Sequence, residues 1–164
     1  MARLLAAPGL ERRAIASARL WPTAPGAWAG PTDVVGDSLA ASVPGTVAGA
    51  LRAAGRWITG DPRDLDREDA WFRFALDVPD DGRRWRLRFE RLATPGQAWV
   101  GPGSAPIALA ALQPQHLALP PGPVEVVVMF PALATALAQK WPRPRWKTRL
   151  VASQNMRFVR TTLL

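Results

Sequence analysis

Apolar and polar side chains alternate with a period of two in the middle of the chain. Every second residue from Phe72 to Val78 is large and apolar, and the run ends at the turn-forming residues 79–82. From Trp85 to Phe89 the alternation resumes, with arginines between the apolar residues. This period places alternate side chains on opposite faces of an extended strand. The pattern predicts two strands, the second with one apolar face and one charged face.

Further strands are predicted on the C-terminal side of this pair. Val124–Phe130 is apolar at nearly every position, which predicts a central strand buried on both faces. Shorter strands are predicted over residues 97–100, 107–110, 116–119 and 156–164. Short strands separated by turn residues about every 8–12 positions are typical of an all-β sandwich or barrel. Because strands and helices do not alternate along the chain, a parallel doubly wound sheet is not expected.

One short helix is predicted near residues 46–54. The Thr46 hydroxyl can cap its start, and Gly55 can close its end in a left-handed conformation. Val47, Leu51 and Ala54 then fall on one face of the helix.

The N-terminal part of the chain lacks a regular pattern. Residues 1–20 are therefore expected to form a weakly structured segment, with a short helix conceivable within Leu4–Ala18. Trp21 and Trp28 lie among prolines and glycines, so these large side chains are expected to anchor irregular backbone. The β-sandwich domain is expected to cover residues 21–164.

The composition fits one globular domain. The chain has 164 residues, of which 48 % are hydrophobic and 21 % are charged, and this size is enough for a single core. The absence of cysteine excludes disulfide bonds, thiolate metal sites and cysteine nucleophiles. Met1–Leu20 has no sustained apolar run, so we recognise no signal peptide and expect a cytoplasmic location. No apolar run reaches the roughly 18 residues that a membrane span needs.

The chain is strongly basic, with a formal net charge of +8. Only Lys140 and Lys147 among its 21 basic residues are lysines, so nearly all of the positive charge is arginine. Such a charge permits a nucleic acid, an anionic membrane or an acidic protein as partner. The arginines are scattered along the sequence, however, and binding of nucleic acid requires them to cluster. The sequence therefore does not favour a nucleic-acid partner.

Three segments carry a resemblance to a known family. They are Val43-Pro44-Gly45-Thr46-Val47, then Glu68–Phe74 with its Trp-Phe-Arg-Phe run, then Leu87–Thr94 leading to Ala98–Val100. In this order the segments resemble the N-terminal sugar-binding-type domain of glycoside hydrolase family 2, especially of its β-mannosidase-like members. The resemblance covers residues 21–164 and implies a galactose-binding-like jelly-roll β-sandwich.

The resemblance also implies a function. In the family, this domain packs on an immunoglobulin-like domain and on a (β/α)₈ barrel that carries both catalytic glutamates. A barrel needs about 250 residues, so this chain has no counterpart of the catalytic residues. It is expected to be a non-catalytic accessory or carbohydrate-binding domain of a β-mannosidase- or β-galactosidase-type enzyme of carbohydrate metabolism. Its expected partners are the missing immunoglobulin-like and barrel domains, because the last predicted strand suggests a chain cut from something longer.

Other chemistry finds little support in the sequence. The densest run of acids, Asp61–Asp69, is interpreted as a solvated loop that balances the arginines, although a calcium ion at Asp61, Asp64 and Asp66 is conceivable. His116 is the only histidine, and it is expected at the surface or half-buried in a strand. One histidine can hardly anchor zinc, and the chain has no nucleotide-binding glycine motif. No metal or cofactor is therefore expected.

The eight tryptophans are the most unusual feature of the composition. Trp71, Trp85 and Trp99 are expected in the core. Prolines hold the segment Trp141–Trp146 extended, so its indoles could stack on a sugar while arginines bind the hydroxyl groups. The candidate carbohydrate-binding residues are Trp141, Arg143, Arg145, Trp146, Arg157 and Arg160.

Two other interpretations of Trp141 and Trp146 stay open. Packing against a partner domain is favoured over sugar contact, and single-stranded nucleic acid is the least favoured. The alternatives for the whole chain are correspondingly a stand-alone carbohydrate-binding module and a basic nucleic-acid-binding domain.

Overall fold

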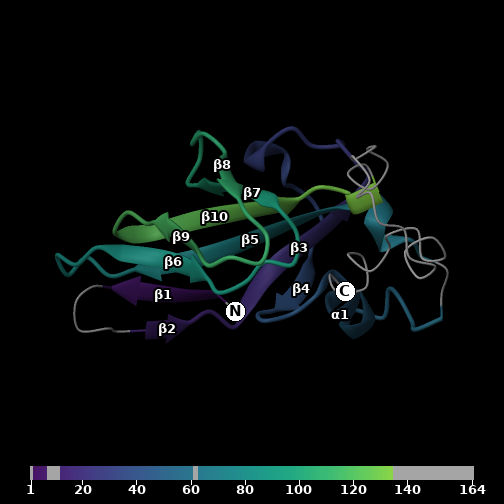
Figure 1. Cartoon of the computed structure of the whole chain (residues 1–164), viewed down its shortest axis with the longest axis horizontal. Coiled ribbons are helices and arrows are strands. Elements are labelled where there is room, and N and C mark those ends of the chain that lie inside the picture. The colour runs from purple at the N-terminus through teal and green to yellow at the C-terminus, as the bar shows by residue number, and fades with distance from the viewer. Residues whose placement is uncertain (1, 7–11, 61–62, 135–164) are drawn as a thin grey trace, which may run out of the picture.

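The computed structural model describes residues 2–6, 12–60 and 63–134. These residues form two antiparallel β-sheets and one short helix, so the predicted all-β sandwich is confirmed (Figure 1). The four-stranded sheet has the order β2-β1-β6-β9, and the six-stranded sheet has the order β4-β3-β5-β10-β7-β8. The jelly-roll connectivity of the galactose-binding-like fold stays a prediction.

From residue 46 to residue 134, the helix and the strands lie where the sequence pattern predicts them. In the four-stranded sheet the strands are β1 Ala2–Ala6, β2 Arg12–Ala14, β6 Trp85–Phe89 and β9 Gln115–Ala118. In the six-stranded sheet they are β3 Ser17–Thr23, β4 Leu39–Ser42, β5 Asp69–Val78, β7 Gly96–Val100, β8 Ile107–Leu109 and β10 Gly122–Phe130. The helix α1 spans Val47–Ala53, and the two 3₁₀ turns are η1 Pro31–Asp33 and η2 Leu65–Arg67. The strand predicted over residues 156–164 lies outside the described residues.

The pairing of β5 with β10 forms the centre of the six-stranded sheet. Nine residue pairs join the two strands, and the register sets Val126 opposite Phe74 and Val127 opposite Arg73. Since β10 also pairs with β7, it is an interior strand, as predicted. The even-numbered residues of both strands consequently face the four-stranded sheet, while the odd-numbered residues face away from it.

Between the sheets lies the larger of the hydrophobic cores. β6 contributes Trp85, Leu87 and Phe89, and all three are buried against residues of β5 and β10. Phe74 and Phe89 meet edge to face across the two layers, with ring centroids 5.9 Å apart. Trp85 therefore lies in the core, as the alternation predicts.

A second apolar cluster covers the outer face of the six-stranded sheet. Trp71 is fully buried, stacks on Trp99 at 5.6 Å and meets Trp28 edge to face at 5.9 Å. Trp28 and the buried Val34 belong to the segment 24–36, which lies over these rings. The Trp21 indole nitrogen donates a hydrogen bond to the Gly36 carbonyl at 3.1 Å. Trp71 and Trp99 are thus core residues, as expected, but of a core on the outer face.

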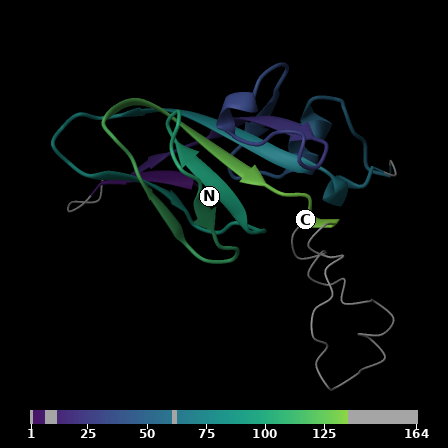
Figure 2. The same ribbon diagram turned by 90° about the horizontal axis from the view of Figure 1, so that it is seen from above.

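The short helix forms where the capping residues predict it. The hydroxyl oxygen of Thr46 accepts a hydrogen bond from the Gly49 N–H at 3.0 Å, and Gly55 adopts a φ of +67° at the end. The sequence predicts that Leu51 and Ala54 share the apolar face of the helix. In the structure Ala50 is buried with Leu51, and Ala54 is exposed. Figure 1 and Figure 2 both place α1 and the end of β10 at the same end of the sandwich.

The expectation of a weakly structured segment over residues 1–20 is wrong. β1 pairs with β6, and β3 pairs with β5, so this part of the chain supplies strands to both sheets. Ala2 and Leu4 are buried against β6. No described residue within Leu4–Ala18 is helical, and Trp21 lies in β3 rather than in irregular backbone. Small alanines gave the segment a weak local pattern, and packing against distant strands overrides local propensity.

The buried carboxylate of Asp69 ties two distant segments to the sheet. Its oxygens accept hydrogen bonds from the Gly26 N–H at 2.8 Å and from the Ala132 N–H at 2.7 Å. Gly26 lies in the segment that covers the tryptophans, and Ala132 follows β10. The Asp69 side chain at the start of β5 therefore holds both segments in place.

The substitution Asp69→Ala should lower the free energy of unfolding by about 3 kcal/mol, because hydrogen bonds to a charged group contribute roughly 1.5–3 kcal/mol each. The matched control is Asp77→Ala, on the same strand and the same face, where the side chain is exposed. It should change stability by at most about 0.5 kcal/mol. Urea unfolding followed by circular dichroism measures both, and equal losses would contradict this role of Asp69.

Candidate functional site

The residues that the sequence proposes for sugar contact cannot be placed. Trp141, Arg143, Arg145, Trp146, Arg157 and Arg160 all lie outside the described residues, so their role stays a prediction. The described part of the chain offers two other surfaces. One is a pocket at the end of the sandwich near α1, and the other is the outer face of the four-stranded sheet.

The pocket has a volume of about 340 Å³ and an aromatic floor. Phe72 and Phe130 project into it from β5 and β10, with their rings edge to face at 5.9 Å. Phe74 and Phe89 also line it, and both are buried. A volume of this size is at the lower end of the range of about 300–1,000 Å³ for small-molecule sites.

Two glycines allow the backbone to form this pocket. A side chain at Gly45 would collide with the carbonyl oxygen of Ser42, so only glycine fits the turn before α1. A Cβ at Gly96 would lie 2.6 Å from the Met129 carbonyl oxygen and 2.9 Å from the Phe130 ring. Gly96 on β7 thereby leaves room for Phe130 to lie at the floor.

The walls of the pocket come from three segments that are far apart in the sequence. Residues 43–47 precede and begin α1, residues 65–70 include η2 and the start of β5, and residues 89–94 follow β6. The three segments that carry the family resemblance overlap these walls and the floor. Sequence reasoning identified the segments, but it did not predict that they meet at one cavity, because the meeting depends on long-range strand pairing.

The rim of the pocket carries both signs of charge. Arg63 donates two hydrogen bonds to Glu68, from Nε to Oε1 at 2.9 Å and from Nη2 to Oε2 at 2.8 Å. These bonds raise the pKa of Arg63 above its ordinary value, against the opposing effect of burial. Asp66 is buried in the same segment of the wall, and the exposed Arg91 lines the pocket from the segment after β6.

The interpretation of Asp61–Asp69 as a solvated loop is therefore only partly right. Within its described part, Asp66 and Asp69 are buried, while Glu68 is held by Arg63. The calcium interpretation includes Asp61, which lies outside the described residues. Among residues 2–6, 12–60 and 63–134, no group of three or more His, Cys, Asp and Glu side chains could hold a metal ion.

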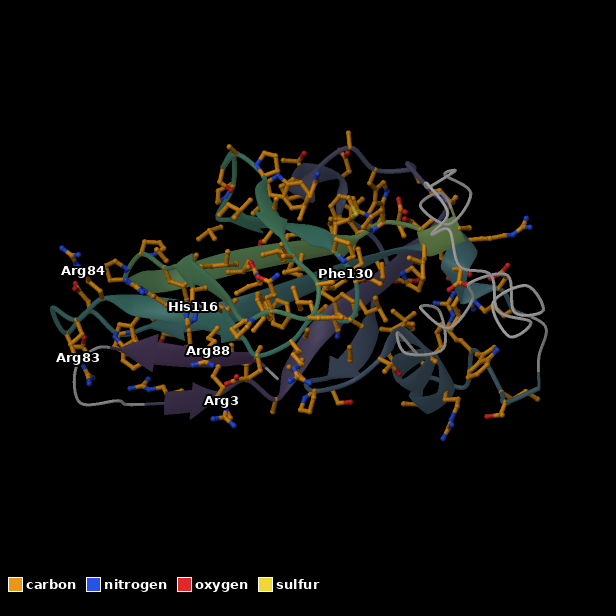
Figure 3. The ribbon with its side chains drawn as sticks, in the orientation of Figure 1. Arg3, Arg83, Arg84, Arg88, His116 and Phe130 are labelled. Carbon is orange, nitrogen blue, oxygen red and sulfur yellow. The ribbon has the colours of Figure 1, made fainter. Side chains whose placement is uncertain are left out.

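The second surface is the outer face of the four-stranded sheet. The register places Arg3, Arg88 and His116 side by side on β1, β6 and β9, and Arg86 lies two residues from Arg88 on the same face. Figure 3 shows Arg3, Arg88 and His116 in one line across the sheet, and Arg84 to the left of that line near Arg83. His116 is exposed in a strand, as expected. Arginines that are scattered in the sequence therefore gather on one face.

At the turn between β5 and β6, one ion pair perturbs a carboxylate. Arg83 Nε donates to Asp81 Oδ2 at 2.8 Å, and the Trp85 indole donates to Asp81 Oδ1 at 3.2 Å. The hydrogen bond from Arg83 is the main cause that lowers the pKa of Asp81 from 3.8 to about 2. Because the folded state favours the ionised form, this contact stabilises the turn above about pH 4 and is lost as the pH falls toward 2.

We expect the Asp81 carboxyl group to titrate with a midpoint near 2 in an NMR pH titration. In the Arg83→Gln variant the midpoint should move most of the way back to 3.8, because the largest cause of the shift is removed. A midpoint near 3.8 in both proteins would show that Arg83 does not hold this carboxylate.

The fold and the pocket together define a class: an all-β sandwich with a ligand-sized pocket at one end. No helix among the described residues is long and apolar enough to cross a membrane. A scan against protein-family models finds no match to the chain, and a search of curated proteins finds no relative.

Proposed function

We propose that the chain is a non-catalytic carbohydrate-binding domain, the accessory domain of a family 2 glycoside hydrolase, and that the pocket is its sugar site. The observation that supports this proposal is the position of the three family-like segments. Residues 43–47, 68–74 and 89–94 all contribute to the same pocket. Segments that served only to stabilise the sandwich would have no reason to meet at a ligand-sized cavity.

The chemistry of the pocket suits a sugar ring. Phe72 and Phe130 offer apolar faces on which the C–H groups of a pyranose can pack. Arg91 can donate hydrogen bonds to hydroxyl groups, and the Asp66 carboxylate, which also lines the pocket, can accept them. An apolar floor with a few polar groups at the rim is the usual design of a small-molecule site.

The same geometry favours binding over hydrolysis. Glycoside hydrolysis needs two carboxyl groups about 5–9.5 Å apart on either side of the bond that breaks. The described acids that line the pocket are Asp66 and Glu68, which are two residues apart on one wall. Glu68 is also held through both oxygens by Arg63. In the proposed enzyme, catalysis is therefore the task of the barrel domain.

Titration with methyl β-mannoside and methyl β-galactoside tests the pocket. In two-dimensional NMR spectra of the protein, the amide signals of residues 43, 45–47, 66–68 and 91–94 should shift with a millimolar dissociation constant, since the site is small and has few polar groups. Arg91→Ala should weaken the binding several-fold. The matched control Arg84→Ala removes another exposed arginine, from the opposite end of β6, and should leave binding unchanged.

Two results would contradict the proposal. Absence of any shift at tens of millimolar of both sugars would remove carbohydrate binding by this pocket. Release of nitrophenol from a nitrophenyl β-mannoside by the purified chain would show that it is catalytic after all. The accessory role has its own test, because the gene beyond the codon for Leu164 should encode an immunoglobulin-like segment and a barrel with two glutamates.

A further inference from the structure

The outer face of the four-stranded sheet concentrates positive charge to an unusual degree. We call it the arginine face and define it by Arg3, Arg84, Arg86, Arg88 and His116. None of the strands β1, β2, β6 and β9 contains an acidic residue. Glu90, directly after β6, accepts a hydrogen bond from Arg88 at 3.0 Å, so this acid offsets only one of the arginines.

The arginine face differs in kind from the outer face of the other sheet. There, tryptophans and valine are buried beneath the segment 24–36. On the arginine face, Arg84, Arg86 and His116 are exposed, and no Trp or Phe of the four strands points outward, because Trp85 and Phe89 are buried in the core. Figure 3 shows the labelled arginines well away from Phe130 in the pocket. The two surfaces are therefore separate.

These properties select one kind of ligand. A protein partner would need an apolar centre to its interface, and single-stranded nucleic acid would need aromatic rings on which bases can stack. A row of guanidinium groups suits phosphates, to which arginine can donate paired hydrogen bonds. We infer that the arginine face binds the phosphate backbone of a nucleic-acid duplex without reading its base sequence.

The dimensions of the face agree with this ligand. Neighbouring strands are about 4.8 Å apart, and residues two apart along a strand are about 6.8 Å apart. The face therefore measures about 10 Å from β1 to β9 and about 14 Å from Arg84 to Arg88. The minor groove of B-DNA is only about 6 Å wide, so these arginines can reach phosphates of both strands at once.

Fluorescence anisotropy with a short duplex DNA of mixed sequence tests the inference on the full chain. Each phosphate contact contributes about 0.9 to the slope of log affinity against log salt. The exposed Arg84 and Arg86 should together contribute about −2 to this slope between roughly 50 and 200 mM salt. A duplex of a different sequence should bind equally well, because the contacts are to phosphates.

Two double variants, each of which removes two positive charges, test whether binding depends on the arginine face or only on the net charge of the protein. Arg84→Gln with Arg86→Gln removes two exposed arginines from the face, and Arg52→Gln with Arg56→Gln removes two exposed arginines at the end of α1. The first pair should make the slope less steep by about 2, so that the affinity falls about tenfold less between roughly 50 and 200 mM salt than it does for the unmodified protein. The second pair should change the affinity by less than twofold.

Several outcomes would overturn the inference. It fails if both double variants weaken binding equally, because net charge alone would then explain it. It also fails if the duplex does not bind at low salt, or if single-stranded DNA binds more tightly. Polygalacturonate could also bind more tightly than the duplex and lose affinity in the Arg84→Gln, Arg86→Gln variant. That result would assign the face to an acidic polysaccharide instead. None of these results bears on sugar binding in the pocket, which Arg84→Ala leaves intact.

Discussion

The antiparallel register between β5 and β10 determines which side chains face each layer of this protein. A shift of β10 by one residue against β5 would turn Val126 out of the inter-sheet core and would bring Glu125 into it. The same register places Trp71 beside Met129 on the outer face, where Trp99 and Trp28 complete the cluster. Phe72 and Phe130, at one end of the pair, form the floor of the pocket. The core between the sheets, the tryptophan cluster on the outer face and the floor of the pocket therefore depend on one pair of strands.

The sequence predicts these strands well because their side chains alternate clearly in size and charge. β5, β6 and β10 lie where the alternation of Phe72–Val78, Trp85–Phe89 and Val124–Phe130 places them. β1 and β3 were missed for a physical reason. Alanine and proline supply little local signal, and these strands form because β6 and β5, 46 or more residues away, offer them edges with which to pair.

The candidate surfaces show the same limit of local reasoning. The alternation of arginines at 84, 86 and 88 predicted one charged strand face, but Arg3 and His116 join it only through the pairing of β6 with its two neighbours. In the pocket, Ser42 and Arg91 belong to segments with no local relation to each other. The sequence marked the segments as family-like, and the fold brought them to one place.

The outer faces of the two sheets differ in polarity and in whether another segment covers them. The four-stranded sheet is apolar on one face only, so its outer face carries arginines and needs no cover. The six-stranded sheet is apolar on both faces, and its outer tryptophans must be kept from water by the segment 24–36. Asp69, Arg73 and Trp21 anchor that segment to the sheet through Gly26, Val34 and Gly36. The cover occupies the outer face of the larger sheet, so among the described residues the arginine face and the pocket are the two surfaces that we propose for ligands.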